Sequence, residues 1–133
     1  MSIRAVLFDL DNTLTHRGRS VAAFSQDLAD TYQSQLNCVD VEQIESIVNR
    51  IDNGGYPLKE YLTHPSIGAS VAYALLQELN WQVAPHLEEL SNFWFAQFGS
   101  SAVAMPEAEQ TLTRLKQAGY KLAIISNGGH TTR

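Results

Sequence analysis

Two aspartates at the end of an apolar run are the residues in this sequence best suited to chemistry. Asp9 and Asp11 are separated by one residue, and Thr13 follows two positions later. Two carboxylates this close repel each other when both are ionised, and a divalent cation or a shared proton relieves the repulsion. Oxygen donors favour a hard cation such as Mg²⁺, which binds carboxylates together with waters and phosphate oxygens. The pattern therefore favours phosphoryl transfer, with one carboxylate attacking, the other handling the leaving-group proton, and Thr13 donating to phosphate oxygens.

A second candidate segment, Ser126-Asn127-Gly128, closes another apolar run near the end of the chain. The hydroxyl of Ser126 could bind a phosphate oxygen, and the backbone amides of Asn127 and Gly128 could help to hold the anion. Taken alone, this triplet is also a good turn. The acidic motif at the end of the earlier apolar run favours the phosphate-binding interpretation.

Two short strands are expected to position these residues. Residues 3–8 and 120–125 are mostly apolar runs, which is typical of parallel strands covered on both faces. Ligands of open α/β sheets bind outside the carboxyl ends of the strands, so we expect Asp9 and Ser126 at one crevice.

Four amphipathic helices are predicted between the strands, because apolar residues recur there at steps of three or four. Asp40 is placed to cap the second helix, with Gln43 three residues later as in a capping box, and short links predict a small bundle. A fifth helix, with Pro106 in its first turn and Gly119 at its end, precedes the second strand. The apolar positions of the four helices are Val21, Phe24, Leu28, Tyr32 and Leu36; Val41, Ile44, Val48 and Ile51; Ile67, Val71, Leu75 and Leu79; and Leu87, Leu90, Trp94 and Phe98.

This order of elements predicts the α/β class, with a partial doubly wound (Rossmann-like) parallel core and an inserted helical-bundle cap. Residues 1–16 and 100–133 are expected to form the core, and residues 17–99 the cap.

In its strand context, the Asp9-x-Asp11-x-Thr13 pattern, continued by Leu14 and Thr15, resembles the first motif of the haloacid dehalogenase-like superfamily. The segment from Lys121 to Gly128 is similar to the second motif of that family. The resemblance implies that Asp9 is the nucleophile that becomes an aspartyl phosphate and that Asp11 is the general acid/base. It also implies a Mg²⁺ cofactor held by the Asp9 carboxylate and the Asp11 backbone carbonyl. The helical cap would close over the site and select a small phosphorylated metabolite.

Asp11 also separates subclasses of that family. Members that displace halide commonly lack the second aspartate, so the resemblance favours a phosphatase over a dehalogenase. A phosphomutase, which returns the phosphoryl group to its product, stays open. So does a non-catalytic domain that binds a partner through its cap or its sheet edge.

The family resemblance implies two further motifs, one a lysine or arginine and one acidic. The residues after Gly128 contain neither a lysine nor a carboxylate side chain. We therefore expect this chain to be the N-terminal portion of a longer fold. Alone, it is expected to bind Mg²⁺ poorly and to be inactive. Its open sheet edge would leave room for self-association.

Composition excludes some classes of function. Apolar residues make up 44% and charged residues 17% of the chain, as in ordinary globular proteins. The net charge of −5 argues against a nucleic-acid-binding face. The apolar runs are too short to span a membrane. A single cysteine, Cys38, and a start without a signal-peptide pattern favour a cytoplasmic setting.

Other residues near the site have weaker patterns. Arg17 and Arg19, at the entry to the cap, could clamp an anion, but a solvated hinge is the preferred interpretation. The 53–61 segment could face the site, although its pattern is also that of a helix stop followed by a turn. The aromatic residues of the fourth helix, with Trp81, are expected in the core of the cap.

Overall fold

Two strands from opposite ends of the chain lie side by side and point the same way. The computed structural model describes residues 2–127 and pairs β1 (Ala5–Phe8) with β2 (Lys121–Ile124) in parallel, with Phe8 opposite Ile124. The ladder continues past β2, where the N–H of Ile125 donates to the carbonyl oxygen of Phe8 at 2.8 Å. The two predicted strands are confirmed, and they bring the segments that follow Phe8 and Ile125 to one end of the sheet.

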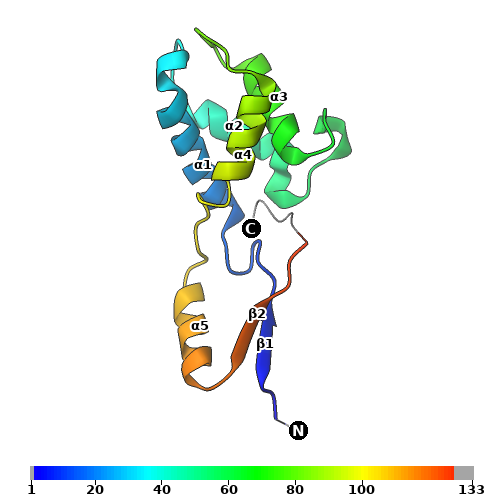
Figure 1. The fold of residues 1–133 in the computed structure, drawn as a ribbon, viewed down its shortest axis with the longest axis vertical. Helices are drawn as coiled ribbons and strands as arrows, with labels where there is room; N and C mark the ends of the chain where they lie inside the picture. The colour runs from blue at the N-terminus through cyan, green and yellow to red at the C-terminus, as the bar shows by residue number, and fades with distance from the viewer. Residues whose placement is uncertain (1, 128–133) are drawn as a thin grey trace.

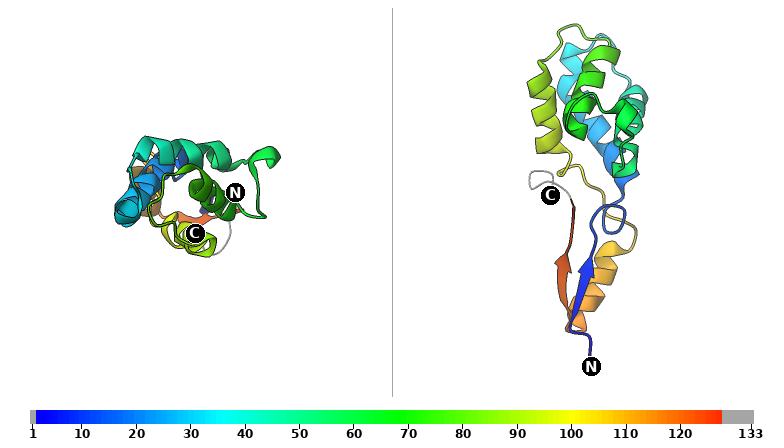
Figure 2. Two further views of the ribbon diagram at one scale, coloured as in Figure 1. Left: turned by 90° about the horizontal axis from the view of Figure 1, so that it is seen from above. Right: turned by 90° about the vertical axis from the view of Figure 1, so that its right-hand side faces the viewer.

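Helix α5 (Ala108–Gln117) precedes β2 and lies along one face of the sheet (Figure 2). It ends before Gly119, whose φ of +91° is the left-handed conformation expected at a helix C-terminus. The prediction that Pro106 lies in its first turn is wrong. The helix begins two residues later, because Glu107 adopts a left-handed φ of +65° at the N-cap.

The other face of the sheet is not covered by the described residues, which corrects the expectation of strands buried on both faces. Leu7 is 59% exposed, and Ala123, its register partner on the same face, is exposed as well. The apolar runs encode strands that could be buried on both faces, but α5 is the only helix of residues 2–127 that lies along the two-stranded sheet (Figure 2).

The cap is a bundle of four helices that lies beyond the carboxyl ends of the strands (Figure 1). Its helices are α1 (Arg17–Tyr32), α2 (Val41–Asp52), α3 (Ile67–Glu78) and α4 (Leu87–Gln97). The fold is therefore a partial α/β core with a helical cap, as predicted. The division of the chain at 16/17 and 99/100 stays a prediction. Within residues 2–127, none of the helices is long and apolar enough to cross a bilayer.

The ends of two cap-domain helices, α1 and α2, are set by local hydrogen bonds and turns. The Asp40 carboxylate accepts the N–H of Gln43 at 3.1 Å, so the predicted N-cap of α2 is present. The side chain of Gln43 donates instead to the carbonyl oxygen of Glu78 on α3. Helix α1 ends at Tyr32, earlier than predicted, and a 3₁₀ turn (Gln33–Gln35) follows it. Leu36 is nevertheless buried in the core.

The hydrophobic core of the described residues lies inside the cap. Its aromatic centre is Phe24, whose ring centroid lies 5.0 Å from that of Trp94 and 5.8 Å from that of Phe98. Trp94 and Phe98 stack on each other at 4.3 Å. The prediction that these aromatics form cap core is confirmed. The buried apolar residues are Val21, Phe24, Leu28, Ala29, Tyr32, Leu36, Ile44, Ile47, Val48, Ile51, Val71, Ala72, Ala74, Leu75, Leu79, Leu90, Trp94 and Phe98.

Candidate active site

The loop that follows β1 is a compact turn organised around one carbonyl oxygen. The oxygen of Leu10 accepts the backbone N–H groups of Thr13, Leu14 and Thr15 at 3.2, 2.9 and 3.1 Å. The Thr15 hydroxyl donates to the same oxygen at 3.3 Å. Asn12 has a φ of +56°, a left-handed conformation that asparagine tolerates better than most residues. These bonds fix the path of the backbone between the two aspartates and the cap.

The two connections between cap and core are hydrogen-bonded to each other. The N–H of His16, just before α1, donates to the carbonyl oxygen of Val103 at 2.7 Å. The N–H of Met105 donates to the carbonyl oxygen of Leu14, also at 2.7 Å. The segment that enters the cap and the segment that leaves it are therefore hydrogen-bonded to each other where the chain passes between cap and core. The acidic loop leads directly into this paired region.

A cavity of about 570 Å³ lies between the carboxyl ends of the strands and the cap. Asp9, Asp11, Ser126 and Asn127 line its core side. Four of the six predicted site residues are thus brought to one cavity. Gly128, the predicted end of the second motif, lies outside the described residues.

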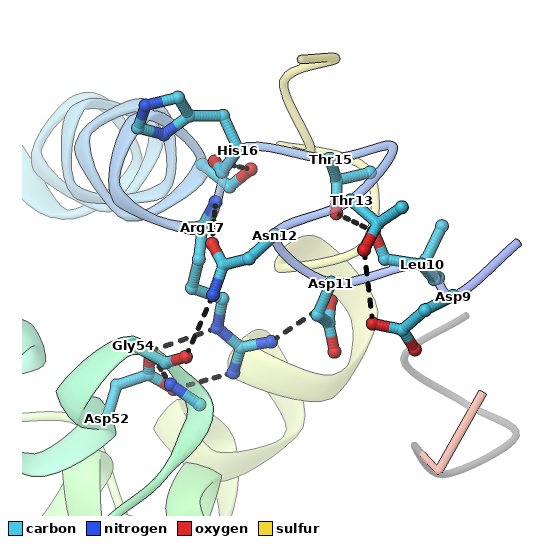
Figure 3. Close-up of polar contacts among 12 residues, drawn as sticks. Asp9, Leu10, Asp11, Asn12, Thr13, Thr15, His16, Arg17, Asp52 and Gly54 are labelled. Atoms are coloured by element: carbon cyan, nitrogen blue, oxygen red, sulfur yellow. Dashed lines mark hydrogen bonds and ion pairs between the residues drawn. The ribbon is translucent and has the colours of Figure 1, made fainter. Parts of the chain in front are cut away.

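Thr13 does not line the cavity, but its side chain contacts Asp9, the candidate nucleophile. Its hydroxyl donates to the Oδ2 atom of Asp9 at 3.4 Å (Figure 3). The prediction that Thr13 binds phosphate oxygens stays a prediction, and the observed contact places this hydroxyl beside the Asp9 carboxylate.

Arg17 is held between two acidic residues at the cap side of the site. Its Nε and Nη2 atoms donate to the two carboxylate oxygens of Asp52 at 3.0 and 2.6 Å, and Nη1 lies 3.4 Å from Oδ1 of Asp11 (Figure 3). The guanidinium also lies over the ring of Phe98, 4.6 Å from its centroid. Burial alone would lower the pKa of Arg17, but the hydrogen bonds and charge of Asp52, with a contribution from Asp11, raise it overall.

The expectation that Arg17 is a solvated hinge is therefore wrong. Its side chain is 13% exposed and that of Asp52 is fully buried. A guanidinium forms a planar fork that matches a carboxylate, which explains how this charge is accommodated inside the protein. Arg19 is exposed, as a solvated residue would be.

The loop after α2 reaches the site, which the 53–61 pattern had left open. The helix ends at Asp52, and Gly54, Gly55 and Tyr56 line the cavity. The side-chain amide of Asn12 donates to the carbonyl oxygen of Gly54 at 3.3 Å, so the acidic loop of the core contacts the cap loop directly.

Sequence reasoning missed Asp52. A signal was present, because Asp52 comes four residues after Val48 and so falls on the apolar face of α2. A carboxylate on a buried helix face needs a buried cationic or hydrogen-bonding partner. Arg17 and the N–H of Gly55, at 3.1 Å from Oδ2 of Asp52, are those partners.

The donors at the core side suit a hard cation in chemical type. The Asp9 carboxylate and the Asp11 backbone carbonyl are oxygen donors, and Mg²⁺ usually takes one or two carboxylates and keeps several waters. Residues 2–127 contain no group of three or more His, Cys, Asp or Glu side chains arranged to hold a metal ion. A carboxylate and a backbone carbonyl are compatible with Mg²⁺ in chemical type, and the described residues do not by themselves complete a coordination shell.

Comparison with known proteins gives the family. A family model described as haloacid dehalogenase-like hydrolase matches residues 3–133. Phosphoglycolate phosphatase of Psychrobacter arcticus is 31% identical over 130 residues, which is 96% of this chain and 51% of that protein. The chain thus spans about half the length of the curated relative it matches.

A solved structure supports the same fold. The crystal structure of a dehalogenase superposes with a TM-score of 0.54 at 23% identity, over 98% of this chain and 54% of that one. At this identity the likeness concerns the fold alone. Because the family model covers nearly the whole sequence, the chain belongs to the haloacid dehalogenase-like hydrolases.

Proposed function

We propose that the protein hydrolyses phosphate monoesters of small metabolites through a covalent intermediate on Asp9. One observation carries the proposal. Asp9, Asp11, Ser126 and Asn127 line a single cavity at the carboxyl ends of two parallel strands, where ligands of such sheets bind. The phosphatase name of the relative that is 31% identical supports the reaction class.

In the first step, a carboxylate oxygen of Asp9 attacks the phosphorus atom and the bond from phosphorus to the alcohol oxygen breaks. The Asp11 carboxylic acid gives its proton to that departing oxygen, so the products are a free alcohol and an aspartyl phosphate. In the second step, water attacks the same phosphorus and gives a proton to Asp11. The bond to Asp9 then breaks, inorganic phosphate leaves, and both side chains return to their initial states.

The neighbouring residues would orient these groups. The Thr13 hydroxyl donates to Asp9 and so limits rotation of the carboxylate. We propose that the Ser126 hydroxyl and the backbone amides of Asn127 and Gly128 donate to the non-bridging phosphate oxygens.

The ionised Asp9 carboxylate and a phosphate dianion repel each other, so the site needs positive charge. The Asp9 carboxylate and the Asp11 carbonyl would hold Mg²⁺, which supplies this charge and polarises the phosphoryl group.

The test uses the full-length protein with 4-nitrophenyl phosphate and Mg²⁺. We expect Asp9→Asn to lower kcat by roughly 10³-fold or more, because the nucleophile is lost. Asp30→Asn, at an exposed position of α1, is the matched control and should keep wild-type activity. Removal of Mg²⁺ with a chelator should abolish turnover, and Mg²⁺ should restore it.

A second readout follows the intermediate itself. Quenched reactions should contain one phosphoryl group bound to the Asp9 side chain, detected by peptide mass spectrometry. Wild-type turnover by Asp9→Asn would refute the proposal.

A further inference from the structure

We propose that Arg17 is a positioning residue for the general acid, and that it holds the Asp11 carboxyl group in the orientation that delivers a proton to the departing alcohol. The inference rests on the proposed function, because that function assigns the proton transfer to Asp11. It adds that the cap orients the acid, since Arg17 is the first residue of α1 whereas Asp11 lies in the loop that follows β1.

The guanidinium of Arg17 is fixed by the cap. Its Nε and Nη2 atoms donate to the two carboxylate oxygens of Asp52 at 3.0 and 2.6 Å. Asp52 is fully buried, and its Oδ2 atom also accepts the N–H of Gly55 at 3.1 Å. The guanidinium lies over the ring of Phe98, 4.6 Å from its centroid. Because the planar group is held by two bonds and a ring, the position of its third nitrogen, Nη1, is set by the cap.

Arg17 contacts two successive residues of the acidic loop (Figure 3). Its Nη1 atom lies 3.4 Å from Oδ1 of Asp11. Its backbone N–H donates to the side-chain oxygen of Asn12 at 3.2 Å, and the side-chain amide of Asn12 donates to the carbonyl oxygen of Gly54 at 3.3 Å. The side chain of Asp11 and the residue after it are therefore both held by the start of α1 and the loop after α2.

The contact with Arg17 decides which oxygen of Asp11 can carry the transferred proton. A guanidinium stays protonated and has only N–H donors. The Oδ1 atom that faces Nη1 is therefore an acceptor, and a proton on the carboxyl group belongs on Oδ2. This restriction is the same for an ionised and a protonated Asp11, and it holds alongside any further contact of the carboxyl group. In the proposal, Oδ2 meets the departing oxygen in the cavity that Asp11 lines.

Two esters that differ in their need for an acid provide the test on the full-length protein with Mg²⁺. 4-Nitrophenolate is a stable anion and departs without a proton, whereas the alkoxide of 4-nitrobenzyl phosphate must be protonated as it departs. The value of kcat/KM reports the steps up to departure of the alcohol. A loss of folded molecules would lower it equally for both esters, so the ratio of the two values follows acid catalysis and not stability.

The main variant combines Arg17→Gln with Asp52→Asn, which removes the cation without leaving a lone buried charge. We expect it to lower kcat/KM for 4-nitrobenzyl phosphate by about tenfold or more relative to 4-nitrophenyl phosphate. Asp11→Asn removes the acid itself and should shift the ratio in the same direction by at least as much. Arg19→Gln is the matched control, because Arg19 is exposed in the same turn of α1 and should keep the wild-type ratio.

Arg17→Lys gives the answer if circular dichroism shows that the double variant does not fold. It keeps a cation beside Asp52, but one ammonium group cannot maintain both the two-pronged contact with Asp52 and the contact with Asp11. The ratio should again fall. An unchanged ratio in whichever of these variants folds would overturn the inference. A ratio that rises would also overturn it, because the cation would then act mainly by keeping Asp11 from being protonated.

Failure of the proposed function would look different. If the wild type hydrolyses neither ester, the reaction class is wrong and the inference falls with it. If the wild type is active and Asp11→Asn keeps the wild-type ratio, Asp11 is not the acid and there is nothing for Arg17 to orient. If Asp11→Asn shifts the ratio and the Arg17 variants do not, the inference alone is rejected.

Discussion

Arg17, at the first position of α1, and Asp52, at the last position of α2, form a two-pronged pair in which the carboxylate is fully buried. The same guanidinium reaches Asp11 in the core, 3.4 Å from its Oδ1 atom. The pair therefore joins two cap helices and also contacts the proposed acid/base residue. Loss of one partner of this pair should destabilise the fold more than loss of one partner of an exposed ion pair, because the remaining charge is left buried and uncompensated.

Replacement of Asp52 by alanine should lower the free energy of unfolding by about 3–5 kcal/mol, since Arg17 would stay buried without its main partner. Urea unfolding of the full-length protein measures this change. The matched control is Glu78→Ala, which removes the partner of Arg50. Those two side chains are 40% and 38% exposed, and such pairs contribute about 1 kcal/mol or less. Equal losses in the two variants would contradict the assignment of a buried pair.

A second prediction concerns the close approach of α3 and α4. A Cβ atom added to Gly68 would lie 2.4 Å from Cδ1 of Trp94, a side chain that is itself fixed between Phe24 and Phe98. Gly68→Ala should therefore lower the free energy of unfolding by about 1–3 kcal/mol through overpacking.

The control for this substitution is Gly18→Ala in α1. There a Cβ atom would lie 3.3 Å from Cε1 of His16, which is a much wider approach than at Gly68, and alanine is the better helix former. Gly18→Ala should be neutral or stabilising in the same thermal or urea unfolding experiment. A neutral Gly68→Ala would show that Trp94 can move at little cost.

The periodic parts of this structure are those that the sequence predicts best. The predicted helices of the cap are confirmed. Their apolar faces pack against one another, and Val21, Val48 and Val71 are buried between them. Side chains whose partners are distant in the chain escape such reasoning. Arg17 was expected in solvent because a local pattern contains no information about Asp52, which is 35 residues away. Likewise, apolar strands predict burial on both faces, yet Leu7 is exposed because covering a face takes a further element.

The acidic residues of the loop could be predicted from the sequence, whereas the contacts that hold the loop against the cap could not. Asp9 and Asp11 stand out because two carboxylates after an apolar strand have few structural uses. The contact of Asn12 with Gly54 has no such signal, since an asparagine before a turn is common for local reasons. The position of the cap loop over the site is thus a property of tertiary packing.

A third prediction tests the hydrogen bond between Thr13 and Asp9. Thr13→Val keeps the shape of the side chain and removes the hydroxyl that donates to Asp9 at 3.4 Å. We expect kcat for 4-nitrophenyl phosphate to fall by roughly tenfold or more, because the carboxylate loses one orienting donor. Thr13→Ser keeps the donor and should restore most of the rate.

The control for Thr13→Val is Thr31→Val, whose hydroxyl is exposed on α1 and donates to the carbonyl oxygen of Asp27. This variant should leave kcat unchanged. Equal kcat values for Thr13→Val and Thr13→Ser would mean that the hydroxyl does not help to orient Asp9.

The fourth prediction follows from Tyr32 in the core of the cap. Burial raises the pKa of Tyr32 to about 12, and the negative charge of Glu89, to which its hydroxyl donates at 3.3 Å, acts in the same direction. The folded state therefore disfavours the phenolate. The stability that this shift provides is fully present below the ordinary tyrosine pKa of about 10 and is lost as the pH rises from there to 12. A shift of this size corresponds to roughly 2–3 kcal/mol.

Urea unfolding at a series of pH values compares wild type with Tyr32→Phe. At pH 8 the variant should be less stable by about 1 kcal/mol, because it lacks the hydrogen bond to Glu89. Between pH 10 and 12 the wild type should lose stability more steeply, so the difference should shrink and then change sign. Tyr56→Phe is the control, because the Tyr56 side chain is 79% exposed and its loss should leave the curve parallel to wild type. Parallel curves for wild type and Tyr32→Phe would mean that Tyr32 ionises as readily in the folded protein as in the unfolded chain.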